Sequence, residues 1–430
     1  MEVDILAEKA QNIQDRALAS SPDIQQILSI VRNFIEDSKV LCYGGTAINN
    51  LLPKDEQFYD PAFDVPDYDF YSQTPQYDAM RLCDIFVKHG FANVEAKPGA
   101  HLLTFKVFVD FIGVADITYL DPNIFKKLWK EDIVRDGIHY VTPNFLRMSM
   151  YLELSRPRGD VSRWSKVYRR LMLLNKYYPI QCEIDEKPHP MLSDDARTRI
   201  ETILKSGKVV LIGLRATELH TKSRSNKWEL PIDVLADTAS YEKFQDVFAD
   251  VFSEKISIVE HSAYDELLPS HTDIIQKESG KILVRVFETQ ACHSYNSMAN
   301  GIKVGSIPTL LQFFFGFVYA DAHYLEGFDQ NRIICIAQRL LDVSHRRFKT
   351  LTPIECLGTE NTIRDIKAKT SKLRTDTPKT SPDFLRLFFT YRPGILSRTQ
   401  KKSLKKKLVQ TMKRLPASTS MLITDHDPSS

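Results

Sequence analysis

The chain has 430 residues, of which 43% are hydrophobic and 26% are charged, and its formal net charge is +2. This composition is typical of a globular protein and excludes a disordered or fibrous chain, while the length predicts two or three domains of roughly 100 to 200 residues each. The small net charge says little about partners, which have to be inferred from local patterns.

Two features predict an intracellular protein that does not use a membrane. The N-terminal residues 1–4 lack the basic and apolar regions of a signal peptide. No segment reaches the roughly 18 uninterrupted apolar residues of a membrane span. The nearest candidate, residues 307–320, is interrupted by Gln312 and therefore predicts a buried helix.

The cysteines are far apart and show no Cys-x-x-Cys spacing, which argues against a zinc site or a disulfide framework. We therefore expect free, mostly buried thiols. The six positions are Cys42, Cys83, Cys182, Cys292, Cys335 and Cys356.

The first motif lies in residues 23–50. Apolar residues recur at helical spacing over 24–35, and the short apolar run 40–43 that follows predicts a strand. The run ends at Gly44-Gly45-Thr46, where a second helix is predicted to begin. Paired glycines let the backbone approach a phosphate closely, and the N–H groups at the helix start and the Thr46 hydroxyl can donate to its oxygens.

An aspartate-rich strand follows at residues 64–71. Alternate residues of a strand point to the same side, so Asp67 and Asp69 should project together. Neighbouring carboxylates repel each other unless a cation lies between them, and oxygen-only ligands suit Mg²⁺ or Mn²⁺. Solvated surface acids also give this spacing, so the motif gains its meaning from the glycine turn that precedes it.

A two-metal site needs a third carboxylate, and residues 102–120 offer two. This region predicts two strands separated near Ile112-Gly113. Asp116 lies in an apolar, β-branched run without a neighbouring base, where burial would be costly without a cation. We therefore prefer Asp116 to Asp110 as the third ligand.

Residues 143–157 and 163–171 predict two helices, the second of them rich in basic and aromatic side chains. Such a mixture suits phosphates and a stacked base, although a solvated helix face is the alternative. We expect Lys166 to contact a triphosphate, with Arg163 as the other candidate.

Part of the pattern recurs 169 residues later, which predicts a duplicated domain. Gly213 and Ala216 follow an apolar run as Gly44 and Ala47 do, and residues 329–340 resemble 159–171. The second copy reads Pro231-Ile232-Asp233 where the first reads Asp67-Tyr68-Asp69, so one carboxylate is missing. We expect an active domain over 1–180, a degenerate copy over 181–350 and an extension over 351–430.

In the extension, order should weaken from residue 351 onward, because 370–382 is rich in Ser, Thr, Lys and Pro and 416–430 has the composition of a loose end. Residues 399–415 predict a basic amphipathic helix. Eight Lys or Arg and no acid lie between Arg398 and Arg414. Such a helix could bind RNA phosphates, acidic lipid or a partner.

The residues 43–49, 67–71 and 114–117 resemble the nucleotidyltransferase superfamily that includes DNA polymerase β and poly(A) polymerases. More narrowly, 143–157 and 163–171 resemble the poly(A) polymerases of large cytoplasmic DNA viruses. The resemblance covers most of residues 38–180, is fainter in the second copy and is absent from the last fifty residues.

This resemblance implies an α/β nucleotidyltransferase fold. Together with the repeat and the basic segment, it leads us to expect two tandem nucleotidyltransferase-like domains, the second degenerate, and a basic C-terminal tail. It implies AMP transfer from ATP to an RNA 3′ end with two Mg²⁺ or Mn²⁺ ions, in the host cytoplasm or the virion, by a homodimer or with a processivity subunit. The implied metal ligands and triphosphate contacts are Asp67, Asp69 and Asp116, and Gly44, Gly45 and Thr46. A transferase acting on another acceptor, such as a tRNA 3′ end or a small molecule, and a non-catalytic RNA-binding scaffold are the alternatives.

Overall fold

The computed structural model describes residues 2–60, 62, 64–182, 190–221, 228–252, 255–264, 267–289, 291–320, 330–346, 353–358 and 362–412. It divides into two compact units. Unit 1 comprises Met1–Thr142 with Ile366–Pro416, and unit 2 comprises Pro143–Asp365. The units are bounded differently from the domains expected at 1–180, 181–350 and 351–430, which remain a prediction.

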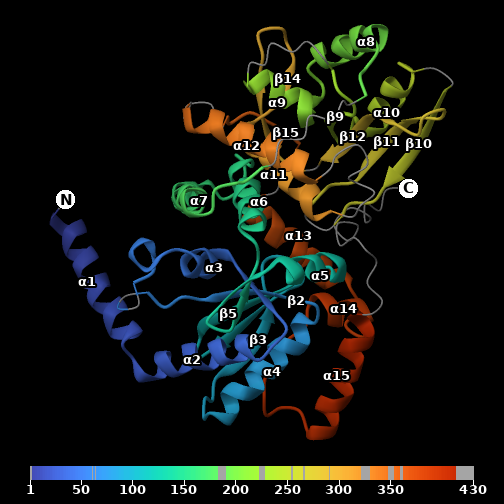
Figure 1. Cartoon of the computed structure of the whole chain (residues 1–430). Coiled ribbons are helices and arrows are strands. Elements are labelled where there is room, and N and C mark those ends of the chain that lie inside the picture. Colours follow the sequence, from blue (N-terminus) through green and yellow to red (C-terminus); the bar gives the residue numbers. More distant parts are fainter. Residues whose placement is uncertain are drawn as a thin grey trace. The chain divides into compact units, whose positions relative to one another are not determined.

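Unit 1 is built on a mixed seven-stranded sheet (Figure 1). In sheet order its strands are β3 (Val94–Pro98), β4 (Thr104–Val109), β5 (Ile112–Tyr119), β2 (Tyr68–Ser72), β1 (Leu41–Tyr43), β7 (Ile138–Tyr140) and β6 (Ile133–Arg135). The other elements before residue 142 are α1 (Glu2–Ala19), α2 (Pro22–Glu36), α3 (Gly44–Leu51), η1 (Lys54–Glu56), α4 (Pro75–Lys88) and α5 (Pro122–Glu131).

The two faces of the unit 1 sheet differ in burial. Alternate residues of β4, Phe105, Val107 and Val109, are buried, and α4 packs against β3, β4 and β5. The intervening residues Lys106 and Phe108 are only half-buried. Such an alternation of buried and half-buried residues is typical of a strand that packs against the core on one face only. One face of the sheet is therefore core, while the other remains partly open and carries the polar side chains.

Unit 2 is built on an eight-stranded sheet. In sheet order its strands are β10 (Ile256–His261), β11 (His271–Gln276), β12 (Ile282–Thr289), β9 (Ile232–Asp237), β8 (Val210–Ile212), β14 (Lys303–Gly305), β13 (His293–Ser297) and β15 (Cys356–Leu357). Its helices are α6 (Pro143–Leu154), η2 (Val161–Arg163), α7 (Trp164–Tyr177), α8 (Asp194–Lys205), α9 (Gly213–Thr221), α10 (Tyr241–Ala249), α11 (Ile307–Tyr319) and α12 (Gln330–Arg346).

The first seven strands of the unit 2 sheet repeat the unit 1 sheet strand for strand. Antiparallel pairs β3·β4, β4·β5, β2·β1 and β7·β6 correspond to β10·β11, β11·β12, β9·β8 and β14·β13. The parallel pairs β5·β2 and β1·β7 correspond to β12·β9 and β8·β14. In each sheet a helix begins at the glycine directly after a corresponding strand, α3 at Gly44 after β1 and α9 at Gly213 after β8.

The buried helix predicted over 307–320 is confirmed as α11, all of whose residues are buried. Ser306 caps it by accepting a hydrogen bond from the Thr309 N–H group, and Pro308 occupies its first turn. Within the part of the chain that the structure describes, no helix is both long enough and apolar enough to cross a membrane.

The C-terminal segment is more ordered than its composition predicts. Residues 370–376 belong to α13 (Ile363–Asp376), so the expected loss of order is wrong there, because Lys, Arg and Leu in this stretch are good helix formers. The C-terminal segment continues through α14 (Pro382–Leu387) to the predicted basic helix, which is present as α15 (Arg398–Met412). The predicted loose end at 416–430 lies outside the described residues.

The basic helix α15 packs on unit 1. Leu408 is buried, α15 lies against α4, and Lys401 Nζ is 2.7 Å from Asp84 Oδ1. The segment before α15 extends the sheet, because Ala96 and Tyr391 exchange two backbone hydrogen bonds of 2.8 and 3.0 Å. Lys413 and Arg414, two of the eight basic residues, lie outside the described residues.

The expectation of free thiols is wrong for one pair of cysteines. Cys292 and Cys356 form a disulfide, although 64 residues separate them. The antiparallel pairing of β13 with β15 brings the two together, with His293 opposite Leu357. No sequence spacing signals this pairing. Cys42, Cys83 and Cys335 are buried free thiols, and Cys182 is half-buried.

We expect Phe86→Ala to destabilise unit 1 by about 3–5 kcal/mol, because Phe86 is fully buried where α4 covers the sheet and its removal leaves a cavity. Its neighbour Val87 is exposed, and Val87→Ala is the matched control, with an expected loss within about 0.5 kcal/mol. Urea unfolding of the three proteins measures both. Equal losses for the two variants would contradict the assignment of the α4 core face.

Candidate functional site

The glycine turn brings the start of α3 into contact with β2. Gly44 has a positive φ of 72°, which favours glycine. A β-carbon at Gly44 would overlap Asp69 Oδ2, so only glycine allows this approach. Gly45 is the next residue of α3 and is half-buried. The first-turn N–H groups of a helix have no partner within the helix and favour an anion. A carboxylate and a potential anion site are therefore adjacent.

Thr46 connects the glycine turn to Asp67. Its hydroxyl donates a 2.8 Å hydrogen bond to the Asp67 carbonyl oxygen, and its side chain is buried. β2 begins at Tyr68, so Asp67 lies just before the strand and not within it as predicted. Asn49 holds the preceding loop, because its Oδ1 accepts from the Phe58 and Tyr59 N–H groups at 2.8 and 2.9 Å.

Asp69 and Asp116 lie directly opposite each other on the parallel strands β2 and β5. Neighbouring strands are about 4.8 Å apart, which places the two carboxylates on the same face of the sheet. Asp116 Oδ2 is 2.6 Å from Lys106 Nζ on β4. Burial raises the pKa of Asp116; Lys106 opposes this rise, and the negative charge of Asp67 adds to it. The three aspartates therefore share one electrostatic environment.

Asp110 lies far from this environment. It occupies the two-residue turn between β4 and β5 with a φ of 48°, is exposed and accepts a 3.0 Å hydrogen bond from Asn93 Nδ2. Six residues of strand separate it from Asp116, a distance of about 20 Å at 3.3 Å per residue. The geometry thus favours the predicted choice of Asp116.

Arg163 and Lys166 belong to unit 2, at the end of η2 and in the first turn of α7. Both side chains are exposed, and Arg163 Nη2 is 3.3 Å from Glu153 Oε1. Their contact with a triphosphate stays a prediction.

The carboxylates fit divalent metal ions by their chemistry. All their donor atoms are oxygens, as Mg²⁺ and Mn²⁺ prefer, and their mutual repulsion is relieved when a cation binds. Lys106 is the cation that pairs with Asp116, so one positive charge already balances part of the cluster. Asp67, Asp69 and Asp116 are thus the residues that would hold the metal.

Asp69, Asp116 and Lys106 form a row of paired residues across three strands, and in the corresponding row of unit 2 the second and third charges are reversed. Asp233 lies opposite Ile212 as Asp69 lies opposite Tyr43, and a β-carbon at Gly213 would overlap Asp233 Oδ2. Asp233 pairs with Arg285 on β12, where unit 1 has Asp116. Arg285 in turn pairs with Asp273 on β11, where unit 1 has Lys106. A guanidinium therefore replaces the third carboxylate.

The side chains of this second row are fully buried. Arg285 Nε donates to Asp273 Oδ1 at 2.9 Å, and Arg285 Nη1 is 3.8 Å from Asp233 Oδ1. Burial raises the pKa of Asp233 to about 7, although Arg285 opposes the rise. A buried charge needs a partner. The guanidinium of Arg285 supplies that partner in unit 2, as Lys106 does for Asp116 in unit 1.

One further cluster of ligand-type atoms occurs among the described residues. His261, His271 and Asp273 have ligand atoms within 4.8 Å of one another. Both Asp273 oxygens are engaged, Oδ1 by Arg285 and Oδ2 by His261 Nε2 at 3.0 Å. A metal ion would compete with the buried guanidinium for Asp273, so this cluster is better explained as part of the charge network.

Sequence reasoning missed Lys106 and Arg285. Lys106 is ten residues from Asp116 and meets it only because the β4–β5 hairpin sets their register. Arg285 belongs to none of the sequence motifs described above. Arg285 lies 169 residues after Asp116, so the repeat offset, extended as far as β12, would have aligned the two residues.

Comparisons with known proteins agree with these motifs. Residues 29–160 match the sequence model of the poly(A) polymerase catalytic subunit family. A protein of African swine fever virus described as a poly(A) polymerase catalytic subunit is 33% identical over 183 residues, which cover 41% of this chain and 38% of that protein. A protein of Acanthamoeba polyphaga mimivirus with the same description is 33% identical over 185 residues, covering 41% of this chain and 31% of that protein. The match thus spans well under half of each relative.

The fold matches over nearly the whole chain. The crystal structure of the Megavirus polyadenylate synthase superposes with a TM-score of 0.76 at 19% identity, covering 96% of this chain and 88% of that one. The predicted mixed α/β class is confirmed. So is the predicted resemblance to poly(A) polymerase catalytic subunits of large DNA viruses.

We expect Asp233→Asn to change how the stability of the protein depends on pH. An aspartate whose pKa is about 7 in the folded state and about 3.9 in the unfolded state makes its full contribution to stability below pH 3.9, and this contribution falls progressively between pH 3.9 and pH 7. This contribution is lost as the pH rises through 7. The free energy of unfolding of Asp233→Asn, relative to the parent, should therefore rise by on the order of 2 kcal/mol between pH 5 and pH 8. Denaturant unfolding of both proteins at both pH values tests this. A difference in unfolding free energy that is the same at pH 5 and pH 8 would contradict it.

Proposed function

We propose that this chain, a relative of viral poly(A) polymerase catalytic subunits, is a template-independent polynucleotide adenylyltransferase. It transfers AMP from ATP to an RNA 3′ end, the reaction of mRNA polyadenylation. The observation that carries the proposal is the contact of Gly44 with Asp69, which places the carboxylate row beside the start of α3. A pocket for metal-bound phosphates needs both components.

Asp67, Asp69 and Asp116 would hold two Mg²⁺ or Mn²⁺ ions. When bound, such ions activate the attacking hydroxyl and stabilise the leaving oxygen of an in-line displacement. Lys106 positions Asp116 through their 2.6 Å ion pair, and the Thr46 hydroxyl positions the backbone at Asp67. These contacts fix the carboxylates before any substrate binds.

The triphosphate of ATP would lie against the glycine turn. The backbone N–H groups of Gly44, Gly45 and Thr46 supply donors and the positive end of α3. Lys166, with Arg163 as the alternative, is proposed as a further phosphate contact. Nothing in the turn selects adenine, so the preference for ATP rests on the relatives.

We further propose that the chain contains the nucleotidyltransferase-like domain twice and that the second copy is degenerate. The identical strand order and directions of the two sheets support duplication. Pro231 in place of Asp67 and Arg285 in place of Asp116 support the loss of metal binding in the second copy. That copy would then serve as scaffold, nucleic-acid platform or dimer surface.

The place of action and the further partners of the chain are also part of the proposal. The relatives are viral proteins, which favours action in the host cytoplasm or virion. Repeated addition would need either a homodimer or a processivity subunit to retain the RNA. Exposed lysines of α15, Lys402, Lys405, Lys406 and Lys407, favour RNA contact for that helix.

We expect Asp69→Ala and Asp116→Ala to lower single-turnover AMP addition by more than about 100-fold, since the loss of even an outer-shell partner of a metal can cost that much. Asp67→Ala should behave in the same way. Asp110→Ala, the matched control in the β4–β5 turn, should stay within about tenfold of the parent. RNA binding and folding should be retained by all four variants.

If Asp110→Ala is inactive while Asp116→Ala is active, the third ligand is misassigned. If all four variants retain activity, the chemistry lies elsewhere. Transfer of AMP to a small alcohol or a tRNA end, but not to unstructured RNA, would favour the related transferase. RNA binding without any transfer would favour the non-catalytic scaffold.

We expect Gly44→Ala to lower AMP addition by more than about 100-fold, because its β-carbon would displace the Asp69 carboxylate. Gly90→Ala is the matched control: Gly90 also has a positive φ, of 95°, but a β-carbon there meets no atom within 4 Å. Both variants should lose about 1–2 kcal/mol of stability from backbone strain, because alanine disfavours positive φ. Equal activities would show that the close approach to Asp69 is not required.

A further inference from the structure

A row of charged side chains continues from the aspartates to the edge of the unit 1 sheet. Asp69 pairs with Asp116, Asp116 with Lys106, and Lys106 with Lys97 on the edge strand β3. Residues paired in this way share one face of a sheet. At about 4.8 Å per strand, Lys97 lies about 10 Å from Asp116. The row changes from acidic to basic over this distance.

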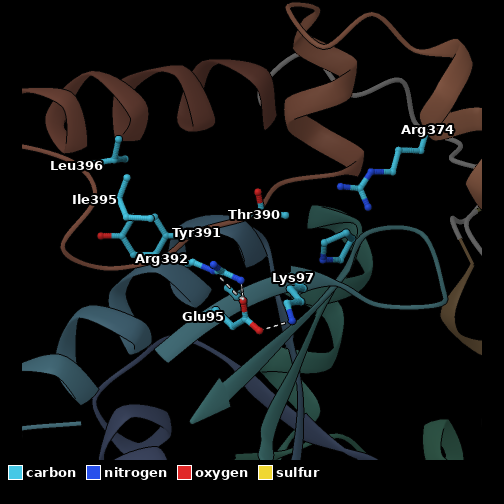
Figure 2. Close-up of a pocket in the computed structure, with 10 residues that line it drawn as sticks. Glu95, Lys97, Arg374, Thr390, Tyr391, Arg392, Ile395 and Leu396 are labelled. Carbon is cyan, nitrogen blue, oxygen red and sulfur yellow. Dashed lines mark hydrogen bonds and ion pairs between the residues drawn. The ribbon is translucent and has the colours of Figure 1, made fainter. Parts of the chain in front are cut away.

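A cavity of about 500 Å³ lies where the row reaches the edge strand (Figure 2). Its walls come from β3, from the segment 390–396 and from Arg374 at the end of α13. Figure 2 shows Glu95 between Lys97 and Arg392, with Arg374 projecting from the opposite wall. The apolar part is formed by Pro98, Tyr391, Ile395 and Leu396.

The charge of this cavity is positive. Three of its lining residues, Lys97, Arg374 and Arg392, are cationic and one, Glu95, is acidic. Arg392 Nη2 is 2.8 Å from Glu95 Oε2, and Lys97 forms an ion pair with the same carboxylate. The Lys97 and Arg392 side chains nevertheless remain 47% and 65% exposed, so both can contact a ligand. One carboxylate cannot neutralise all three cations.

Unit 2 provides an internal comparison. Its corresponding row ends in Asp273 and then Val259 on the edge strand β10, in place of Lys106 and Lys97. The exposed positions of that strand include Ile258 and Val259. The two lysines are therefore present in unit 1, which has both carboxylates Asp69 and Asp116. They are absent from unit 2, where Arg285 replaces the second carboxylate.

We propose that Lys97, Arg392 and Arg374 bind the phosphodiester backbone of the acceptor RNA a few nucleotides before its 3′ end. This inference rests on the proposed function for the identity of the ligand as RNA. The basic row leads from the aspartates into the cavity. The cavity joins cations with apolar and aromatic surface, the combination that binds single strands without sequence preference. Glu95 holds Lys97 and Arg392 in place and limits the affinity.

The test uses the full chain with K97Q/R392Q, E95Q and, as a matched control, K255Q. Lys255 is an exposed lysine of unit 2 that also pairs with an acid, Glu278, at 3.4 Å. Fluorescence anisotropy with an unstructured RNA of about 20 nucleotides gives affinity and its salt dependence. ATP affinity is measured separately by equilibrium binding, and melting curves verify that each variant is folded.

K97Q/R392Q should weaken RNA binding about tenfold and reduce the salt slope by about 1.4, which corresponds to two lost single-strand contacts. E95Q should tighten RNA binding, and K255Q should change nothing. ATP affinity should stay within about twofold of the parent in all variants. A purely structural role for these residues predicts weaker binding for E95Q as well, because both ion pairs are lost.

RNA affinity of K97Q/R392Q within about twofold of the parent would overturn the proposal, as would weaker binding by E95Q. Weaker ATP binding with unchanged RNA binding would instead make the cavity a triphosphate site and would also overturn it. The measurement does not require catalysis. If the chain fails to add AMP but the predicted RNA effects appear, the cavity assignment stands and the proposed function falls.

Discussion

The contact between a glycine at a helix start and an aspartate on the neighbouring strand is the constraint on which both units depend. Gly44 meets Asp69 and Gly213 meets Asp233 in the same way, and neither position has room for a β-carbon. The positive φ of each glycine turns the chain from strand β1 or β8 directly into a helix. This turn places backbone donors beside a carboxylate, and what each unit can then bind depends on the residues paired with that carboxylate.

The two units balance the charge of that carboxylate differently. In unit 1, Asp69 lies opposite a second acid, Asp116, and the surplus negative charge favours external cations. In unit 2 the opposing residue is Arg285, whose buried guanidinium pairs with Asp273 and Asp233. Because the Arg285 guanidinium already supplies a positive charge to these carboxylates, a metal ion is not needed there. The same fold therefore supports a catalytic proposal for one unit and a structural one for the other.

The local patterns were predictable from the sequence, whereas pairings between distant residues were not. The helix, strand and glycine turn at 24–51 follow from apolar spacing. The Lys106–Asp116 pair and the Cys292–Cys356 disulfide depend on strand register, which no local spacing encodes. The return of α15 to unit 1 likewise depends on tertiary packing through Leu408.

The most direct test of the central claim is a nucleotide-incorporation assay with the unmodified chain. The protein is incubated with unstructured RNA and each labelled nucleoside triphosphate in turn, with Mg²⁺ or Mn²⁺ and with a chelator in parallel. We predict that ATP alone extends the RNA 3′ end efficiently, without a template, and that the chelator abolishes the extension. Failure to extend RNA with any nucleotide, or extension that persists in the chelator, would contradict the account.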